Sequence, residues 1–333
     1  MSQIARLSVV VIGRNEGPRL ERCLASVRAM RNDGWESEYL YVDSGSTDDS
    51  LAIAERNGFT TIPLPAGKPT AARGRNAGWR AATGDVVLFL DGDTVLHPEF
   101  VAEASQSFAD AETAVIWGHR RELYPEQTIY NRVMDLDWIY APGWTPFCGG
   151  DALFQRNTLL AVDGFDETLI AGEEPELCRR ILARGERILH VDQPMTGHDL
   201  ALRSFRSYWQ RAERAGHAYA EVAARFAESG SPFWQDEVAR NRKRAMLLMG
   251  LPLVGLVVSL LFLSPWPLLV VAALLLALLL RTAWKARWKS SNKLTLLLYG
   301  AHSHLQQIPI YFGQLRFARN RKAGRKADLL EYK

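Results

Sequence analysis

The sequence predicts an α/β protein, in which a doubly wound, mostly parallel sheet is followed by amphipathic helices and an apolar helical hairpin. Three observations support this prediction. Short apolar runs alternate with segments of helical spacing over the first 200 residues. Two of the apolar runs end directly in carboxylates, as expected where ligand groups gather at the C-terminal ends of parallel strands. Residues 246–280 contain no charged side chain.

The composition limits the protein class. With 333 residues the chain has room for one large domain or two ordinary ones. The net charge of +3 makes it neither acidic nor a polycation, so no nucleic-acid partner is expected. The three cysteines are widely spaced and form no C-x-x-C pair, which fits a reducing compartment. The N-terminus resembles a first strand and not a signal peptide, so this part is expected to stay in the cytoplasm.

The apolar runs before residue 84 each lead through a turn into a helix. Residues 7–12, LSVVVI, are β-branched and typical of a buried strand. Asp48 and Asp49 suit the positive N-terminal end of the helix that follows them. The expected elements are strands at 7–12, 39–42 and 60–64, and helices at 19–30, 50–57 and 73–82.

The stretch GDVVLFLDGDTVLHP, residues 84–98, is the centre of the pattern. Its continuous apolar run predicts a strand covered on both faces, and this strand ends in Asp91 and Asp93. Gly92 between them removes a side chain where a group must approach the backbone. Two carboxylates this close need a cation, and such oxygen ligands suit Mg²⁺ or Mn²⁺ with a substrate phosphate. A polar turn without metal is the alternative for an isolated D-x-D.

The first turn excludes a dinucleotide-binding fingerprint. No G-x-G-x-x-G follows the first strand, whose turn carries Arg14, Asn15 and Glu16 instead. An acid at the end of the second strand, Asp43, is placed to accept hydrogen bonds from a base or ribose. Two arginines, Arg73 and Arg75, are candidates for contact with a diphosphate; a solvated loop charge is the alternative for each.

These blocks together resemble a known family. VVVIGRNE, VDSGSTDDS and ARGRNAGWRAATGDVVLFLDGDT occur in the order and spacing of the inverting family-2 glycosyltransferases with a GT-A fold. The resemblance continues through FCGGD (147–151), GFDE (164–167) and IAGEEPEL (170–177), and covers roughly residues 5–200.

The resemblance implies a role for each block. The first-strand turn and the acid after strand two would hold the nucleotide, and the D-x-D would hold a metal–diphosphate, with Asp93 the more direct ligand. Glu174 occupies the position of the catalytic base, although the pair here is Glu-Glu instead of Glu-Asp, so Glu173 is the alternative. The donor contacts implied are Arg14, Asn15, Glu16, Asp43, Ser44, Arg73, Arg75, Asn76, Asp91 and Gly92, and the acceptor contacts are Phe147, Gly149, Gly150 and Asp151.

Three further features bear on the site. Glu173 and Glu174 open a segment of helical spacing, so they also suit a helix dipole without any catalytic role. A histidine after the last strand of such folds often completes the metal shell, and His198 is at that place; a packed or solvated histidine is the alternative. Residues 130–147 are aromatic-rich and are expected to form an irregular lid or acceptor wall.

The C-terminal part is expected to meet a membrane. Residues 205–226 have the spacing of an amphipathic helix, which lies either on solvent or on the membrane interface. Residues 246–280 are too long for one span, and Ser264-Pro265-Trp266-Pro267 interrupts them, which predicts a hairpin of two short spans. Basic residues precede and follow the hairpin, so both ends are expected in the cytoplasm.

The last segment is less apolar. Polar residues within 293–317 argue against a full span and favour a shallow interfacial or re-entrant element kinked at Pro309. His302 and His304 lack a nearby third ligand, which favours a role without metal. The tail 316–326 is basic and suits solvent or anionic lipid headgroups.

The sequence thus predicts a glycosyltransferase domain at 1–200, interfacial helices at 201–244, a transmembrane hairpin at 245–281, and an amphipathic element with a basic tail at 282–333. We expect a metal-dependent enzyme at the cytoplasmic membrane that moves a sugar from a nucleotide-sugar, with a UDP-sugar as first candidate, to a membrane-associated or lipid-linked acceptor. The alternatives are a processive polysaccharide synthase subunit, a non-catalytic nucleotide-sugar-binding scaffold and a nucleotidyltransferase. The oligomeric state is left open.

Overall fold

The computed structural model describes residues 4–65, 67–228 and 232–325. Contacts divide the chain into two compact units. The first contains the residues up to Leu123 together with Trp138–Leu200, and the second contains Tyr124–Asp137 together with the residues from Ala201 onward. Residue 326, the last of the predicted basic tail, lies outside the described residues, together with residues 327–333.

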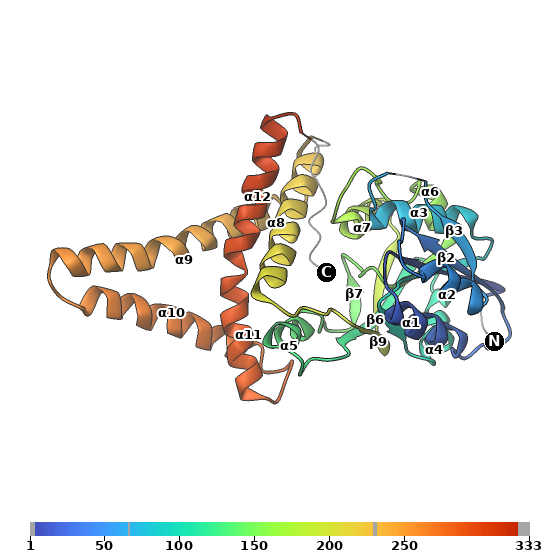
Figure 1. Ribbon diagram of the computed structural model, residues 1–333, viewed down its shortest axis with the longest axis horizontal. Coiled ribbons are helices and arrows are strands. Elements are labelled where there is room, and N and C mark those ends of the chain that lie inside the picture. Colours follow the sequence, from blue (N-terminus) through green and yellow to red (C-terminus); the bar gives the residue numbers. More distant parts are fainter. Residues whose placement is uncertain (1–3, 66, 229–231, 326–333) are drawn as a thin grey trace. The chain divides into compact units, whose positions relative to one another are not determined.

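The first unit is built on one mixed sheet (Figure 1). Its strand order is β3-β2-β1-β4-β8-β6-β9-β5, and β7 pairs with β9. The half from β3 to β4 is parallel, as predicted, whereas β8 runs antiparallel to both β4 and β6. The strands are β1 Arg6–Gly13, β2 Glu36–Asp43, β3 Thr60–Pro63, β4 Val86–Asp91, β5 Thr94–Leu96, β6 Thr113–Glu122, β7 Gly143–Thr145, β8 Ala152–Gln155 and β9 Arg187–His198.

Apolar side chains on the central strands and on the helices form the core. Val9, Val10 and Val11 of β1 are fully buried, as expected for a strand covered on both faces. Leu20 and Leu24 of the first helix are fully buried against the sheet. The helices of this unit are α1 Pro18–Arg28, α2 Ser50–Arg56, α3 Ala71–Ala81, α4 Phe100–Ala104, the 3₁₀ turn η1 Ser105–Ala109, α6 Arg156–Ala161 and α7 Glu173–Ala183. The predicted α/β fold class is confirmed.

The aromatic segment 130–147 is more regular than predicted. Residues Ile129–Asp137 form helix α5, and a short strand, β7, follows. The side chain of Thr128 accepts a hydrogen bond from the backbone N–H of Asn131, which is the geometry of an N-terminal cap. Val133 and Leu136 are buried, at a spacing that gives the helix one apolar face. The high aromatic content of the segment concealed this pattern.

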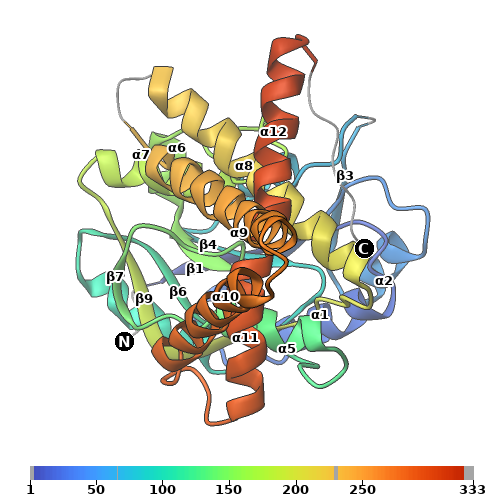
Figure 2. The same ribbon diagram turned by 90° about the vertical axis from the view of Figure 1, so that its left-hand side faces the viewer.

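The second unit is helical. It contains α5, α8 Phe205–Glu228, α9 Gln235–Leu261, α10 Trp266–Lys285, α11 Lys293–Leu305 and α12 Gln307–Lys322. Helices α9 and α10 form the predicted hairpin, and the interruption falls at residues 262–265 (Figures 1 and 2). Helix α9 begins ten residues before residue 245, since the basic stretch before the apolar run is helical as well. Pro309 lies in the first turn of α12, directly after the break from α11.

Candidate active site

Two acids and one histidine form a candidate metal site at the end of the central strand. Potential ligand atoms of Asp91, Asp93 and His198 all lie within 4.8 Å of one another. Pairing of β5 with β9 sets Thr94 opposite His198, which brings the end of β9 beside the D-x-D turn. Asp93 and His198 are buried, and their nearest side-chain atoms are 3.4 Å apart. Two carboxylates and one imidazole form a donor set that fits a divalent cation.

Arg75 joins this acid cluster to the carboxylates of α7. One guanidinium nitrogen donates to Asp91 at 2.8 Å, and another lies 3.0 Å from Glu173 and 3.2 Å from Glu174. The arginine side chain is only 2% exposed. A buried guanidinium needs such carboxylate partners, and its planar fork can hold several of them at once. The three acids therefore share one cation.

The two candidate bases differ in their surroundings. The side chain of Glu174 is 21% exposed, whereas that of Glu173 is 7% exposed and hydrogen-bonded to Arg75. Burial, followed by repulsion from Glu173, raises the pKa of Glu174 to about 7, although Arg75 acts in the opposite direction. A carboxylate with a pKa near neutrality is suited to proton transfer.

Gly150 occupies the space between these groups. A β-carbon at this position would lie 2.4 Å from an Arg75 nitrogen, and 3.1 Å from both Asp91 Oδ2 and Glu174 Oε1. Any larger residue would therefore displace Arg75 or one of the acids. The role implied by the resemblance, contact with an acceptor, stays a prediction, while this close approach gives a structural reason for glycine.

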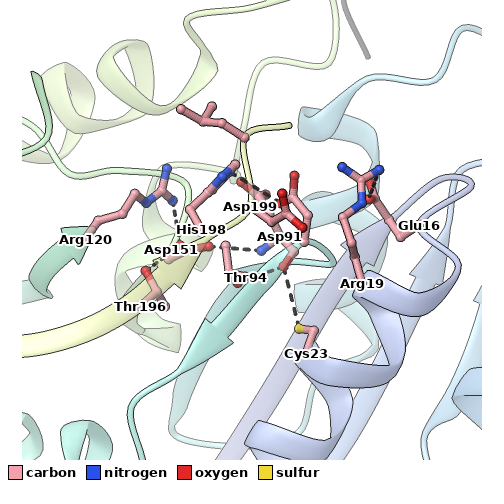
Figure 3. A network of polar contacts seen from close by, with 12 residues as sticks. Glu16, Arg19, Cys23, Asp91, Thr94, Arg120, Asp151, Thr196, His198 and Asp199 are labelled. Atoms are coloured by element: carbon pink, nitrogen blue, oxygen red, sulfur yellow. Dashed lines mark hydrogen bonds and ion pairs between the residues drawn. The ribbon is translucent and has the colours of Figure 1, made fainter. Parts of the chain in front are cut away.

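Asp151 lies beside Asp91 and is almost completely buried. Its side chain is 1% exposed and accepts hydrogen bonds from the Asp91 backbone N–H at 3.0 Å, from Arg120 at 2.6 Å and from Thr196 at 2.9 Å. Burial raises the pKa of Asp151, and the nearby Arg120 opposes that rise. Figure 3 shows this network together with His198. Asp151 therefore holds the backbone of Asp91 in place, which is a positioning role at this site.

The predicted nucleotide-binding turns are tied to each other. Asn15 accepts a hydrogen bond from the backbone N–H of Thr47 at 2.8 Å, and its own N–H donates to Ser46 at 2.9 Å. Asp43 is buried and accepts from the backbone N–H groups of Gly45 and Ser46 at 3.0 and 2.8 Å. The turn after β1 and the loop after β2 thus form one structure.

The remaining donor-side residues divide into two groups. Glu16 pairs with Arg19 at 2.8 Å, and its side chain approaches Gly92, whose absent β-carbon would also meet the Ile12 carbonyl at 3.2 Å. The groups that approach the Gly92 backbone closely are therefore the Glu16 side chain and the Ile12 carbonyl. Ser44 follows directly after β2 and donates its N–H to the carbonyl of Gly13, the last residue of β1. It therefore lies at the same edge of the sheet as Arg14, which follows Gly13.

Arg73 and Asn76 make their contacts away from the acid cluster. The guanidinium of Arg73 donates to the carbonyls of Lys68 and Pro65 in the preceding loop. Asn76 is buried; its side-chain NH₂ donates to the Phe165 carbonyl, and its side-chain oxygen accepts from the Phe165 N–H. In this structure Asn76 fixes the loop before α7 to α3, which is a structural function.

Comparison with known proteins identifies the family. Residues 86–299, close to two thirds of the chain, match glycosyl transferase family group 2, and residues 8–162 match glycosyl transferase family 2. The chain belongs to the family-2 glycosyltransferases. The resemblance found in the sequence is therefore confirmed.

Curated relatives of this glycosyltransferase share about a quarter of its residues. The "Pre-mycofactocin glycosyltransferase" of Mycobacterium tuberculosis is 25% identical over 240 residues, covering 68% of this chain and 49% of the relative. An "N-acetylglucosaminyltransferase" of Rhizobium leguminosarum bv. viciae is 26% identical over 215 residues, covering 56% and 50%. The chain thus spans about half the length of these relatives.

Solved structures confirm the GT-A fold. The mannosyltransferase PcManGT from Pyrobaculum calidifontis, in complex with GDP-Man and Mn²⁺, superimposes with a TM-score of 0.58 at 20% identity, covering 95% of this chain and 88% of that one. S. aureus TarS 1-349 in complex with UDP-GlcNAc gives a TM-score of 0.53 at 16% identity, covering 96% and 92%.

Beside the metal site, the glycosyltransferase has two adjoining cavities. One of about 190 Å³ is lined by aromatic rings together with Gly149 and Asp151. A second of about 610 Å³ shares Arg120, Trp138, Met195 and Thr196 with it and is mainly apolar. The aromatic lining consists of Trp117, Trp138, Tyr140 and Phe147.

Several site residues have no signal in the sequence. Arg120 and Thr196 hold Asp151 from strands β6 and β9, and neither belongs to a recognisable motif. The ring of Trp138 lies 5.1 Å from that of His198 and 5.5 Å from the Arg120 guanidinium. The aromatic content of residues 130–147 indicated a wall of this kind without identifying its members.

Proposed function

We propose that this protein is a metal-dependent, inverting glycosyltransferase that moves a sugar from a nucleotide-sugar to a membrane-associated acceptor. One observation carries the proposal. Arg75 holds Asp91, from the metal cluster, and Glu174, the candidate base, through a single guanidinium. A displacement at the anomeric carbon needs a leaving-group site and a base close together, and this arrangement provides both.

Asp91, Asp93 and His198 would hold the divalent cation, either Mg²⁺ or Mn²⁺. When bound, such an ion stabilises negative charge on the leaving diphosphate. The tied turns at Asn15 and Asp43, with Arg14, Glu16 and Ser44 beside them, would bind the nucleotide. A UDP-sugar is the first donor to test, because one structural neighbour contains UDP-GlcNAc, although another contains GDP-Man.

Glu174 would take the proton from the acceptor hydroxyl. A base on the acceptor side, opposite the leaving diphosphate, gives inversion at the anomeric carbon. Its raised pKa supports this assignment, since a base with a pKa near 7 combines adequate basicity with a useful deprotonated fraction. Glu173 is hydrogen-bonded to Arg75 and would fix the position of that arginine.

The aromatic cavity would receive the acceptor sugar. Rings of Trp138, Tyr140 and Phe147 offer apolar faces to a sugar, and the Gly149 backbone lies among them. The adjoining apolar cavity would suit a lipid portion of the acceptor. These cavities support an acceptor such as a lipid-linked saccharide or a glycolipid.

Helices α9 and α10 would anchor the enzyme in a membrane. By length and composition, both helices can cross a membrane. Only 11% of the 18-residue apolar stretch of α9, and 6% of that of α10, is buried within the protein. Leu260, Leu261 and Leu263 are 64%, 74% and 92% exposed, which is unfavourable in water. Basic residues at both outer ends favour a cytoplasmic location for the catalytic unit.

The direct test is thermal stabilisation of the detergent-purified chain by nucleotides and nucleotide-sugars, with and without Mn²⁺. A ligand that binds the folded state raises the melting temperature by mass action. We expect a shift for one nucleotide family that requires metal, followed by sugar release or transfer in a turnover assay. Binding without any turnover would indicate a scaffold, and no shift with any nucleotide would refute the proposal.

A further inference from the structure

Helices α8 and α12 cross with their backbones in contact. A β-carbon on Gly216 would lie 1.9 Å from the Ile310 carbonyl oxygen, and one on Gly313 would lie 1.9 Å from the Glu213 carbonyl oxygen. Only glycine permits this approach. Because the crossing is fixed by backbone contact, the side chains within about two turns of it are held in a defined arrangement.

A cavity of about 300 Å³ lies beside this crossing. It is lined by Trp209 and Glu213 of α8 and by Phe312, Arg316, Arg319 and Asn320 of α12. The two aromatic rings are 6.0 Å apart. The cavity therefore combines an apolar wall with a group of hydrogen-bond donors.

The charged residues of this cavity leave a net positive charge. Arg316 lies 3.4 Å from Glu213, an ion pair that orients its guanidinium while leaving several of its five N–H groups for other acceptors. Arg319 is exposed, and the described part of the chain contains no carboxylate paired with it. Two arginines against one glutamate, with the amide of Asn320, form a site for an anion with several oxygens.

The position of the cavity within the helical unit indicates the source of that anion. Helices α8 and α12 run side by side and crosswise to the α9–α10 hairpin, and α9 packs against both of them (Figures 1 and 2). If the hairpin spans a bilayer, helices crosswise to it lie along the membrane surface. Tryptophan and arginine side chains are favoured at that depth.

We propose that this cavity binds the phosphate of an anionic glycerophospholipid headgroup. Arg316, Arg319 and Asn320 would donate hydrogen bonds to the phosphate oxygens. Trp209 and Phe312 would contact the glycerol and the first carbons of the acyl chains. The inference rests on the proposed membrane placement of the hairpin and is independent of sugar transfer.

Native mass spectrometry of the full chain in detergent micelles tests this directly. The probes are short-chain phosphatidylglycerol, short-chain phosphatidylcholine and glycerol 3-phosphate, titrated separately. We expect saturable binding of one phosphatidylglycerol and much weaker binding of the other two. Equal affinity for phosphatidylcholine would overturn the requirement for an anion, and comparable binding of glycerol 3-phosphate would assign the cavity to a soluble phosphate.

A charge-matched pair of variants separates the cavity from general attraction to a basic helix. Arg316→Gln with Arg319→Gln should weaken binding of phosphatidylglycerol by at least about tenfold, since charge-assisted hydrogen bonds are lost. Arg321→Gln with Lys322→Gln removes the same charge from the same helix outside the cavity and should leave the affinity nearly unchanged. Equal losses in both variants would refute the site.

Two controls keep the outcome interpretable. If the double variant does not fold, Arg319→Gln alone replaces it, because this exposed side chain can be changed without disturbing the Glu213 pair. Carbonate extraction of native membranes tests the hairpin separately. Release of the chain by carbonate would refute the membrane placement, whereas the lipid titration in detergent decides the cavity on its own.

Discussion

Arg75 donates a hydrogen bond to Asp91 at 2.8 Å from a side chain that is almost completely buried. The same guanidinium lies against both glutamates that open α7. Without it, three neighbouring carboxylates would repel one another in a poorly solvated site. The Arg75–Asp91 contact therefore both stabilises the fold and holds the groups of the proposed reaction in place.

Replacing Arg75 by methionine should destabilise the protein and stop transfer. The change leaves Glu173 buried without its cation, which costs about 3–5 kcal/mol in the free energy of unfolding. Chemical denaturation and turnover would measure the two effects. Arg73→Met is the matched control, because that guanidinium bonds only loop carbonyls among the contacts the structure gives it, and it should change stability by less than about 1 kcal/mol.

Glu174→Gln should retain donor binding and reduce kcat by roughly 10²–10⁴-fold, the usual effect of losing a general base. Calorimetry with the donor and a transfer assay distinguish these effects. Glu173→Gln, measured beside it, should lose less activity if Glu174 is the base. A reversed order would assign the base to Glu173.

The pH dependence should follow the raised pKa of Glu174. A base works only when deprotonated, so kcat/KM should rise as pH increases through about 7 and then level off. As a control, the residual kcat/KM of Glu174→Gln should not rise over this pH range. The assignment would be contradicted if kcat/KM of the wild type, measured at intervals of about 0.5 pH units, did not change between about pH 6 and about pH 8.

The same group should affect stability in the opposite direction. Its pKa in the folded protein, about 7, lies above the ordinary value of 4.5, so the folded state binds this proton more readily than the unfolded chain. The stabilisation is therefore complete at pH values below the ordinary pKa and is lost as pH rises through about 7. In the metal-free protein, Glu174→Gln should reduce this decline in melting temperature.

The metal site predicts a graded response to substitution. Asp93→Asn should abolish the Mn²⁺-dependent part of donor binding, because it removes the negative charge of one of the two carboxylates. His198→Gln should only weaken it, because both carboxylates remain. Titrating the donor after chelation and again after Mn²⁺ addition measures this part. Donor affinity that stays metal-dependent in Asp93→Asn would remove this residue from the site.

Trp138→Ala should raise the KM for the acceptor by roughly tenfold, because a large aromatic face is lost from the cavity. The change in kcat should be smaller. Trp144 provides a control of the same residue type, since it is 45% exposed on β7 and does not line either cavity beside the metal site. Similar changes in both variants would argue against an acceptor site in this cavity.

The sequence by itself determined the local features. Continuous apolar runs predicted β1, β2 and β4, and the D-x-D followed from its place at the end of one of them. The hairpin was also readable, since 35 uncharged positions, residues 246–280, cannot pack in a small soluble domain and Pro265 interrupts them. In each case the information lies within one short stretch of chain.

Only the tertiary structure decided which side chains meet. The predicted contact of Arg75 with a diphosphate stays a prediction, whereas its contacts with Asp91 and the α7 glutamates appear only in the fold. In the same way, Asp151 is held by Arg120 and Thr196. These contacts depend on the antiparallel insertion of β8 and on the pairing of β9 with β5 and β6. Strand order and side-chain direction fix such meetings, and neither is encoded in the spacing of residues along a single segment.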